Sequence, residues 1–366
     1  MSGLAAFLRD LIAQDGPITV ERFMALALGH PTLGYYGTRD PLGAQGDFTT
    51  APEISQMFGE LIGLWAAEAW TACGGPGPKR QPMRLIELGP GRGTMMADAL
   101  RALRVAPDLF GSLEAHLVET SPALAARQRE TLKECGRPVH WHETLEALPE
   151  GPAVILANEF FDALPIRQYV RAGGAWRERM VGLDGEGRFT FGLSDAPEEA
   201  LHVDAPAGAV IEAAVTAQRL MGTLAGRIAA QGGCLLAIDY GHGRTAFGDT
   251  LQAVRWHRFV DPLDAPGEAD LTAHVDFAAL ARAAQAAGAA AQGPVTQRFF
   301  LEQIGIRQRA AALAGRASPN EAQRVGSALN RLTAADQPTD MGALFKVLAV
   351  TPVGAPTLAG FSENAT

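Results

Sequence analysis

Residues 84–100 read RLIELGPGRGTMMADAL, and this stretch decides the fold class. Arg84 to Leu88 is a short apolar run, a glycine-rich turn follows, and a stretch with helical periodicity begins at Thr94. This order predicts a buried strand that leads into a helix. Glycines allow a tight turn that brings the backbone close to a ligand, and the start of a helix offers free N–H groups to an anion. The stretch therefore predicts a strand, a ligand-binding turn and a helix.

The spacing of the glycines distinguishes between two classes of ligand. A dinucleotide fingerprint G-x-G-x-x-G needs glycine at position 94, where this chain has threonine. The pattern here is E-x-G-x-G-x-G, formed by Glu87, Gly89, Gly91 and Gly93. It resembles the pattern of class I methyltransferases, in which the acidic residue faces the cationic methionine part of S-adenosylmethionine. We therefore expect S-adenosylmethionine as the cofactor; a plain strand–helix turn without a ligand is the alternative.

Short apolar runs alternate with helical stretches after this turn, which is typical of a parallel α/β sheet. The expected fold is a Rossmann-like, mostly parallel sheet that ends in an antiparallel C-terminal strand pair. We expect parallel strands at residues 84–88, 115–119, 139–142, 153–158 and 234–240, helices at 94–103 and 122–134, and the final pair at 296–300 and 345–350.

The remaining segments suggest how the chain is divided. Residues 1–78 are expected to form an N-terminal helical lid region, and its boundary lies within the Gly- and Pro-rich linker GGPGPKRQP at residues 74–82. Residues 79–366 then form the cofactor-binding domain. Within this domain, IRQYVRAGGAWRERMVGL and GRFTFGL predict an inserted β meander with helices at about 165–232. A helical insertion is expected at about 301–340.

Acidic and aromatic residues follow the next two strands. Glu119 closes the second strand, where a carboxylate can reach the hydroxyls of a ribose. Trp141, His142 and Glu143 follow the third strand, where such folds hold the adenine by stacking and by accepting from its amino group. The alternatives are a surface acid at Glu119 and a core tryptophan at Trp141.

Further polar residues follow the fourth and fifth strands. The segment ANEFFDALP places Asn158, Glu159 and Asp162 at the carboxyl edge of the sheet, where open α/β sheets bind ligands. Carboxylates beside a sulfonium methyl group could orient a cationic nucleophile or take its proton. Helix capping by Asn158 and Asp162 is the competing interpretation. Asp239 and Tyr240, in IDYGHG, are expected to line the substrate channel.

Two histidines in nearby loops leave their roles open. His242 could act as a base and His274 could reach the site, although a lone histidine in such a loop is more often structural. Asp270, His274 and Asp276 have no matching ligand cluster, so we expect no metal, and Asp276 is better explained as a helix cap.

Composition limits the partners and the compartment. The chain has 366 residues, with 31 Lys and Arg against 40 Asp and Glu, a net charge of −9 that disfavours nucleic acid. Its three cysteines show no C-x-x-C spacing, and no apolar run reaches the length of a membrane span. The N-terminus is predicted to be a helix rather than a leader peptide. These features predict a bacterial cytoplasmic protein without membrane insertion. A homodimer is expected if the meander exposes apolar surface.

Five motifs in this order resemble the MidA-type methyltransferases over nearly the whole chain: GYYGTRDPLGAQGDFTTAPEIS, ELGPGRGT, ANEFFDALP, DYGH and DLTAHVDF. The mitochondrial members of that family are assembly factors for respiratory complex I. The resemblance implies a class I methyltransferase fold, protein arginine methylation, and a complex I subunit as the mitochondrial target. It also implies that Asp47, Phe48 and Thr49 form a lid over the cofactor. Arg92 departs from the small residue found in many relatives.

A guanidinium acceptor suits the paired acids Glu159 and Asp162, because carboxylates bind arginine in a bidentate manner. Two other functions remain open. One is a small-molecule O- or N-methyltransferase. The other is an assembly chaperone that binds S-adenosylmethionine without catalysis.

Overall fold

The computed structural model describes residues 3–38, 50–74 and 82–362. The chain groups into two compact units. Unit 1 comprises residues 1–48, 162–219 and 244–276, and unit 2 comprises residues 49–161, 220–243 and 277–366. This grouping differs from the predicted division at residue 78, because residues 50–74 group with the large sheet in unit 2.

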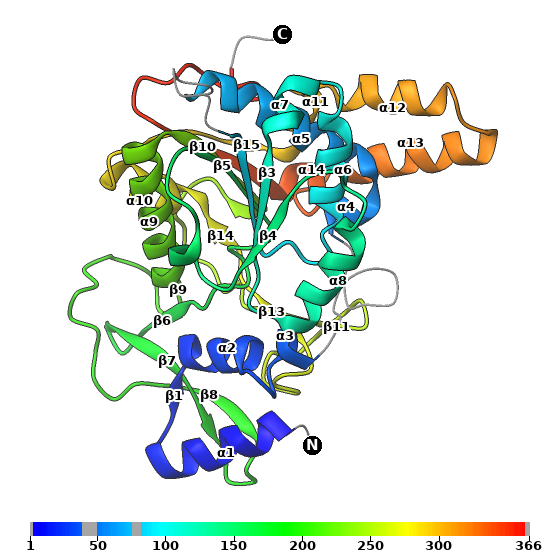
Figure 1. Ribbon diagram of the computed structural model, residues 1–366. Coiled ribbons are helices and arrows are strands. Elements are labelled where there is room, and N and C mark those ends of the chain that lie inside the picture. Colours follow the sequence, from blue (N-terminus) through cyan, green and yellow to red (C-terminus); the bar gives the residue numbers. More distant parts are fainter. Residues whose placement is uncertain (1–2, 39–49, 75–81, 363–366) are drawn as a thin grey trace. The chain divides into compact units, whose positions relative to one another are not determined.

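Unit 2 is built on a mostly parallel sheet (Figure 1). Strands β4, β3, β2, β5 and β10 are parallel to one another, and β16 pairs with β10 in the antiparallel direction. This arrangement confirms the predicted fold class. Along the sheet the strands are β15 (Ala290–Thr296), β16 (Phe345–Thr351), β10 (Gly233–His242), β5 (Ala153–Asn158), β2 (Arg84–Leu88), β3 (Glu114–Val118) and β4 (Val139–His142).

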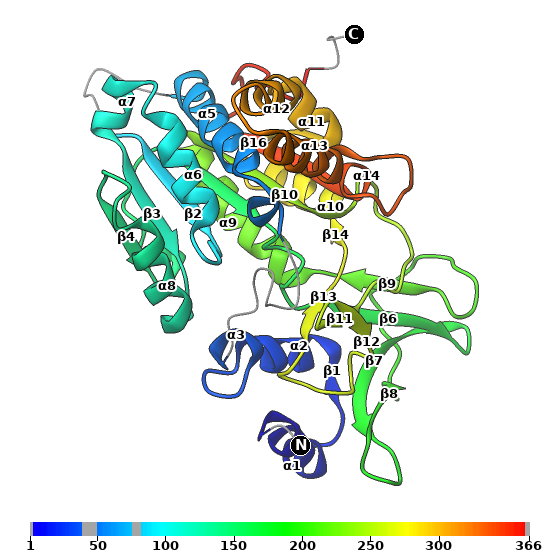
Figure 2. The ribbon, with the colours of Figure 1, turned by 90° about the vertical axis from the view of Figure 1, so that its right-hand side faces the viewer.

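Helices cover both faces of this sheet, as Figures 1 and 2 show. On one face lie α5 (Gln56–Ala72), α6 (Thr94–Leu103) and α8 (Pro122–Leu132), and on the other α9 (Val215–Gln231) and α10 (Phe277–Ala286). The shorter elements are α4 (Ala51–Ile54), α7 (Pro107–Ser112), the 3-10 helix η1 (Leu145–Ala147) and α14 (Met341–Leu344). The main core joins α5 and α6 to the sheet through residues such as Trp65, Leu100 and Leu117.

Two glycines on α5 allow it to pack very closely against α6. A Cβ atom at Gly59 would lie 2.7 Å from the Cβ of Asp98, and one at Gly63 would lie 2.6 Å from the Cα of Ala99. Any larger residue would therefore push the two helices apart. This close contact explains why α5 belongs to unit 2 rather than to a separate N-terminal region.

The C-terminal helices are α11 (Gln297–Gln303), α12 (Ile306–Ala314) and α13 (Pro319–Thr333). In Figure 1, α12 and α13 project from the rest of unit 2 as an antiparallel pair. Glu60 of α5 anchors α12, since its buried carboxylate pairs with Arg309 at 2.7 Å and with Arg101 of α6 at 3.1 Å.

The strand predicted at residues 296–300 is wrong. Strand β15 ends at Thr296, and helix α11 begins at the next residue. The hydroxyl of Thr296 accepts a hydrogen bond from the backbone N–H of Phe299 at 3.3 Å, which caps the helix. Phe300 is buried, and its ring lies 6.2 Å from that of Trp65. The periodicity of a short apolar run does not distinguish a strand from a helix. Here the cap formed by Thr296 determines that the run is helical.

Unit 1 contains the predicted antiparallel meander. Its sheet follows the order β1-β7-β6-β9, with β8 also paired to β7, and a second sheet follows the order β12-β11-β13. These strands are β1 (Ile18–Thr19), β6 (Arg167–Ala172), β7 (Ala175–Leu183), β8 (Phe189–Leu193), β9 (Val210–Ala213), β11 (Gln252–Arg255), β12 (Arg258–Val260) and β13 (Asp270–Thr272), and β14 (Val275–Asp276) follows them. The helices are α1 (Gly3–Asp15), α2 (Val20–Gly29) and α3 (Tyr35–Thr38), and the first two bury Leu8 and Phe23 in the core of this unit.

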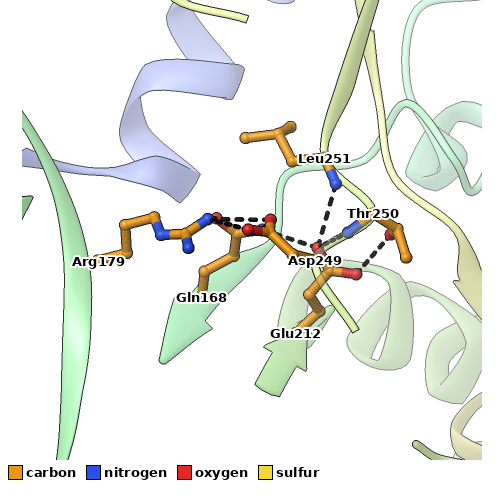
Figure 3. A network of polar contacts seen from close by, with 6 residues as sticks. All are labelled: Gln168, Arg179, Glu212, Asp249, Thr250 and Leu251. Carbon is orange, nitrogen blue, oxygen red and sulfur yellow. Dashed lines mark hydrogen bonds and ion pairs between the residues drawn. The ribbon is translucent and has the colours of Figure 1, made fainter. Parts of the chain in front are cut away.

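A polar network fixes the segment before β11 to this meander (Figure 3). The fully buried amide of Gln168 donates to Glu212 at 2.7 Å and to Asp249 at 3.0 Å. Its oxygen accepts from Arg179 at 2.9 Å, and Arg179 also pairs with Asp249 at 2.9 Å. Glu212 accepts from the backbone N–H of Thr250 at 2.9 Å. The buried Gln168 amide therefore has partners for both its nitrogen and its oxygen, and these contacts join β6, β7 and β9 to the segment before β11.

Candidate functional site

The glycine-rich turn connects β2 to α6, as predicted. Gly89, Gly91 and Gly93 have φ values of 58°, 53° and 79°, a left-handed conformation that favours glycine. A Cβ atom at Gly89 would also lie only 2.9 Å from the ring of Phe160. Gly93 is the N-cap of α6 and has no side chain with which to cap it. The turn therefore leaves the N-terminus of α6 available to an anionic group.

Glu87 lies in β2, next to this turn, and is only 3% exposed. Burial raises the pKa of its carboxyl to about 8, and a hydrogen bond from the backbone of Met96 opposes part of that shift. Its second oxygen, Oε2, has no hydrogen-bond partner within the described residues. A buried carboxyl oxygen without a partner is costly unless a ligand supplies one. The ammonium group of S-adenosylmethionine fits that requirement.

Glu119 follows β3, and both of its carboxylate oxygens are held. Oε1 accepts from the backbone N–H of Ser121 at 2.7 Å, and Oε2 accepts from the side-chain amide of Gln128 at 2.9 Å. The backbone N–H of Glu119 donates to His142 O at 2.9 Å, so the ends of β3 and β4 are joined. Each oxygen keeps a further lone pair for a ribose hydroxyl. Burial raises the pKa of Glu119, and these hydrogen bonds oppose the shift.

The side chains at the end of β4 point in different directions. The indole N–H of Trp141 donates to Gln128 at 3.0 Å, and the guanidinium of Arg129 lies 4.8 Å from the centre of the indole. The ring of His142 instead contacts His116, with 3.0 Å between Nε2 and Nδ1. Glu143 is exposed. Trp141 is therefore anchored to α8. Contact of His142 and Glu143 with the adenine stays a prediction.

Asn158 is the last residue of β5 and Glu159 follows it, beside the segment that begins at Thr50. The carboxylate of Glu159 accepts from the backbone N–H of Ala51 at 3.0 Å and from the Asn158 amide at 3.3 Å. It thereby accepts a hydrogen bond from the first N–H of α4, and the next residue, Pro52, has no N–H. Glu159 also has a φ of 49°, which is rare for a non-glycine residue and typical of functional sites. The side-chain oxygen of Asn158 is buried and has no hydrogen-bond partner within the described residues.

Asp239 is fully buried in β10 and organises the backbone that follows Glu159. Its Oδ2 accepts from the N–H groups of Phe160 and Phe161 at 3.1 and 2.9 Å, and its Oδ1 accepts from Tyr240 N–H at 3.0 Å. Three backbone N–H groups therefore hold this carboxyl group in place. The sequence predicts Asp239 at the substrate channel; the contacts that the structure shows hold the backbone that follows β5.

Asp162 belongs to unit 1, together with two other buried polar residues. Its backbone carbonyl accepts from Ala273 N–H at 3.0 Å. Tyr36 donates its hydroxyl to Asp270 at 2.9 Å, and burial raises the pKa of Tyr36, as do the nearby charges of Asp270 and Asp162. Three of the motifs noted in the sequence thus contribute to a single region of buried negative charge in unit 1.

The predicted lid residues Asp47, Phe48 and Thr49 lie outside the described residues. The adjoining segment is described, and in it Glu53 accepts a hydrogen bond of 2.5 Å from the hydroxyl of Thr94. Glu53, Thr94 and Gln128 were not predicted from the sequence as members of the site. Gln128 carried a weak signal, because it is a polar residue on the inward face of the helix that follows Glu119.

The strand order, the glycine turn and the two acids at the ends of adjacent strands are those of the class I methyltransferase fold. The model of a family of S-adenosyl-L-methionine-dependent methyltransferases matches residues 61–295. This chain belongs to that family, and the predicted family resemblance is confirmed.

Similar proteins agree with this assignment. The chain is 40% identical to "Protein arginine methyltransferase NDUFAF7, mitochondrial" of Danio rerio, a match that covers 86% of this chain and 79% of the relative. For the Homo sapiens protein of the same name, identity is 36% over 93% of this chain and 81% of the relative. A Burkholderia thailandensis crystal structure bound to S-adenosyl-homocysteine superposes with a TM-score of 0.85 and 33% identity, covering 99% of this chain and 95% of that one.

Proposed function

We propose that this protein transfers a methyl group from S-adenosylmethionine to an arginine side chain of a protein. The observation that supports the cofactor is the buried Glu87 carboxylate, whose Oε2 has no partner within the described residues. The acceptor is supported by two relatives that match most of this chain and are named as protein arginine methyltransferases. When bound, the cofactor would supply a methyl group activated by its sulfonium charge.

The roles that we propose at the cofactor follow from charge and position. Glu87 would bind the ammonium group, the N-terminus of α6 would bind the carboxylate, and Glu119 would bind the ribose hydroxyls. His142 and Glu143 would contact the adenine. Beyond the described residues, Asp47 and Thr49 remain the proposed lid.

On the acceptor side, we propose two separate candidates for binding the guanidinium, Asn158 in unit 2 and Asp162 in unit 1. The buried Asn158 oxygen needs a donor, and a buried carboxylate such as Asp162 favours a cation. Arginine stays protonated in water, so a carboxylate that orients it and accepts its proton would assist methyl transfer. Glu159 and Asp239, whose carboxylates accept backbone N–H groups, would mainly hold this edge of the sheet in place.

The decisive experiment is to incubate the protein with methyl-labelled S-adenosylmethionine and an extract from cells that lack it. Labelled proteins are then hydrolysed and their amino acids identified by mass spectrometry. Label in methylarginine supports the proposal, and a respiratory complex I subunit is the first acceptor to examine. Label only in small molecules would support the alternative, a small-molecule methyltransferase. Cofactor binding without any transfer would support the non-catalytic chaperone.

Location and assembly are also proposals. Among the described residues, no helix combines the length and apolar character needed to cross a membrane. The relatives are named as mitochondrial, and for this chain we propose the bacterial cytoplasm, where its three free cysteines would remain reduced.

We also propose a homodimer through β8, because Phe191 and Leu193 are 37% and 41% exposed. Light scattering during size-exclusion chromatography would measure the mass.

A further inference from the structure

Gln128 occupies the centre of the proposed cofactor site without being an obvious ligand itself. It lies on α8, and its side chain is completely buried. A buried primary amide has two N–H donors and one carbonyl acceptor to satisfy. Leaving any of them unpaired would cost stability, so the partners of this amide show what it organises.

All three groups have partners from different parts of the site. The amide nitrogen donates to the backbone carbonyl of Gly91 at 2.8 Å and to Glu119 Oε2 at 2.9 Å. The amide oxygen accepts from the indole N–H of Trp141 at 3.0 Å. Gln128 thus links the glycine turn after β2, the acid after β3 and the tryptophan of β4.

These partners also fix the orientation of the amide. Gly91 O and Glu119 Oε2 are both acceptors, and the indole N–H is only a donor. Turning the amide over would set its oxygen against two oxygens and its nitrogen against an N–H group. Only one orientation satisfies the site, and in it Glu119 is held from both sides, by Gln128 and by Ser121 N–H.

We propose that Gln128 is the positioning residue that sets the recognition of the cofactor's ribose, by holding the Glu119 carboxylate at a fixed distance from the glycine turn. The inference rests on the proposed role of Glu119 at the ribose. It predicts that Gln128 affects ligands according to their ribose hydroxyls, which a residue with only a packing role would not do.

The test compares the binding of S-adenosylhomocysteine and its 2′-deoxyribose analogue by calorimetry. The unmodified protein should bind the hydroxylated ligand about 10-fold or more tightly, because loss of a hydroxyl removes a hydrogen bond to the charged Glu119 carboxylate. Gln128→Leu should bind S-adenosylhomocysteine about 10- to 100-fold more weakly, the range for lost hydrogen bonds to a charged group. Its preference between the two ligands should fall below about threefold.

Two further variants separate the contacts of the amide. Gln128→Glu keeps the acceptor for Trp141 but places oxygen against Gly91 O and Glu119, so it should lose both affinity and ribose preference. Trp141→Phe keeps both donor bonds and should retain the preference. Gln323→Leu, a change of the same kind at an exposed position on α13, is the matched control and should bind like the unmodified protein.

The outcomes separate this inference from the proposed function. If the unmodified protein prefers the hydroxylated ligand and Gln128→Leu shows the same preference, Gln128 has only a packing role and the inference is overturned. If the unmodified protein itself shows no preference, the ribose assignment of Glu119 fails as well. Far-UV circular dichroism and melting temperature monitor folding. Should Gln128→Leu unfold, loss of ribose preference in Gln128→Glu supports the inference, and retention overturns it.

Discussion

The hydroxyl of Thr94 donates a hydrogen bond of 2.5 Å to the carboxylate of Glu53. Thr94 is the first residue of the helix that follows the glycine turn, and Glu53 lies in the short helix α4. Glu159 binds the same short helix from the end of β5, through Ala51 N–H. The segment 51–54 therefore connects the cofactor turn to the edge of the sheet at which we place the acceptor.

Breaking the contact between Thr94 and Glu53 should weaken cofactor binding. We expect Thr94→Val to reduce the affinity for S-adenosylhomocysteine by about 10-fold, because it removes a hydrogen bond to a charged acceptor at the start of α6. Thr94→Ser keeps the hydroxyl and should restore most of the affinity. Calorimetry measures both variants, with Ser318→Ala at the exposed capping box of α13 as the control. Equal affinity of Thr94→Val and the unmodified protein would show that this contact is irrelevant to the cofactor.

Cofactor binding should release protons from Glu87. Burial raises the pKa of Glu87 to about 8, so most of this carboxyl is protonated at pH 7 in the free protein. An ammonium group beside it would favour the ionised form and expel the proton. Calorimetry at pH 7 in buffers of different ionisation enthalpy should therefore detect proton release, and affinity should rise with pH up to about 8. Glu87→Gln should abolish the release. Equal release by that variant would contradict the ammonium assignment.

The same pKa shift predicts how stability depends on pH in the free protein. The folded state holds a proton on Glu87 at pH values where the unfolded chain, with a pKa of about 4.5, has lost it. The contribution of Glu87 to stability is thus fully present below pH 4.5 and declines as pH rises to about 8. Urea unfolding at several pH values should show that Glu87→Gln becomes more stable relative to the unmodified protein across this window. If the stability difference between Glu87→Gln and the unmodified protein did not change with pH, Glu87 would not have the raised pKa that burial gives it.

The close packing of α5 on α6 should tolerate no added methyl group. Gly63→Ala should lower the free energy of unfolding by about 1–3 kcal/mol, as overpacking does in other cores. Gly326, within α13, has no heavy atom within 4 Å of an added Cβ, and Gly326→Ala should increase stability by about 0.5–1 kcal/mol. Chemical denaturation of both variants measures the difference. A stable Gly63→Ala protein would mean that the helices can separate without cost.

The acceptor side is tested by Asp162→Asn. This change keeps the shape of the side chain and removes its charge, so methyl transfer should fall by about 100-fold or more, while affinity for S-adenosylhomocysteine changes by less than about threefold. Asp264→Asn, at an exposed position of unit 1, is the control. Rates with labelled cofactor and calorimetry give the two readouts. Loss of binding and folding together would favour a structural role for Asp162.

Local signals in the sequence predicted the core of this fold. The strand at 84–88, the turn and the helix at 94–103 match the structure because each is determined by neighbouring residues. The strand at 296–300 was wrong because a single threonine cap determined the helix instead. The apolar stripe of α5 was visible, but its glycines at positions 59 and 63 have meaning only beside α6.

The contacts of the candidate site were harder to predict. The sequence places Glu159 and Asp239 at the edge of the sheet, yet it does not show that Glu159 binds Ala51 or that Asp239 binds the backbone of Phe160 and Phe161. Such partners lie about 80 to 110 residues apart, and their pairing depends on strand order rather than on local pattern.

The most direct test of the central claim is calorimetric titration of the purified protein with S-adenosylhomocysteine, and with NAD as the comparison. We predict saturable binding of one S-adenosylhomocysteine per chain and no binding of NAD, because Thr94 stands where a dinucleotide turn needs glycine. Binding of NAD, or the absence of binding by S-adenosylhomocysteine, would contradict it.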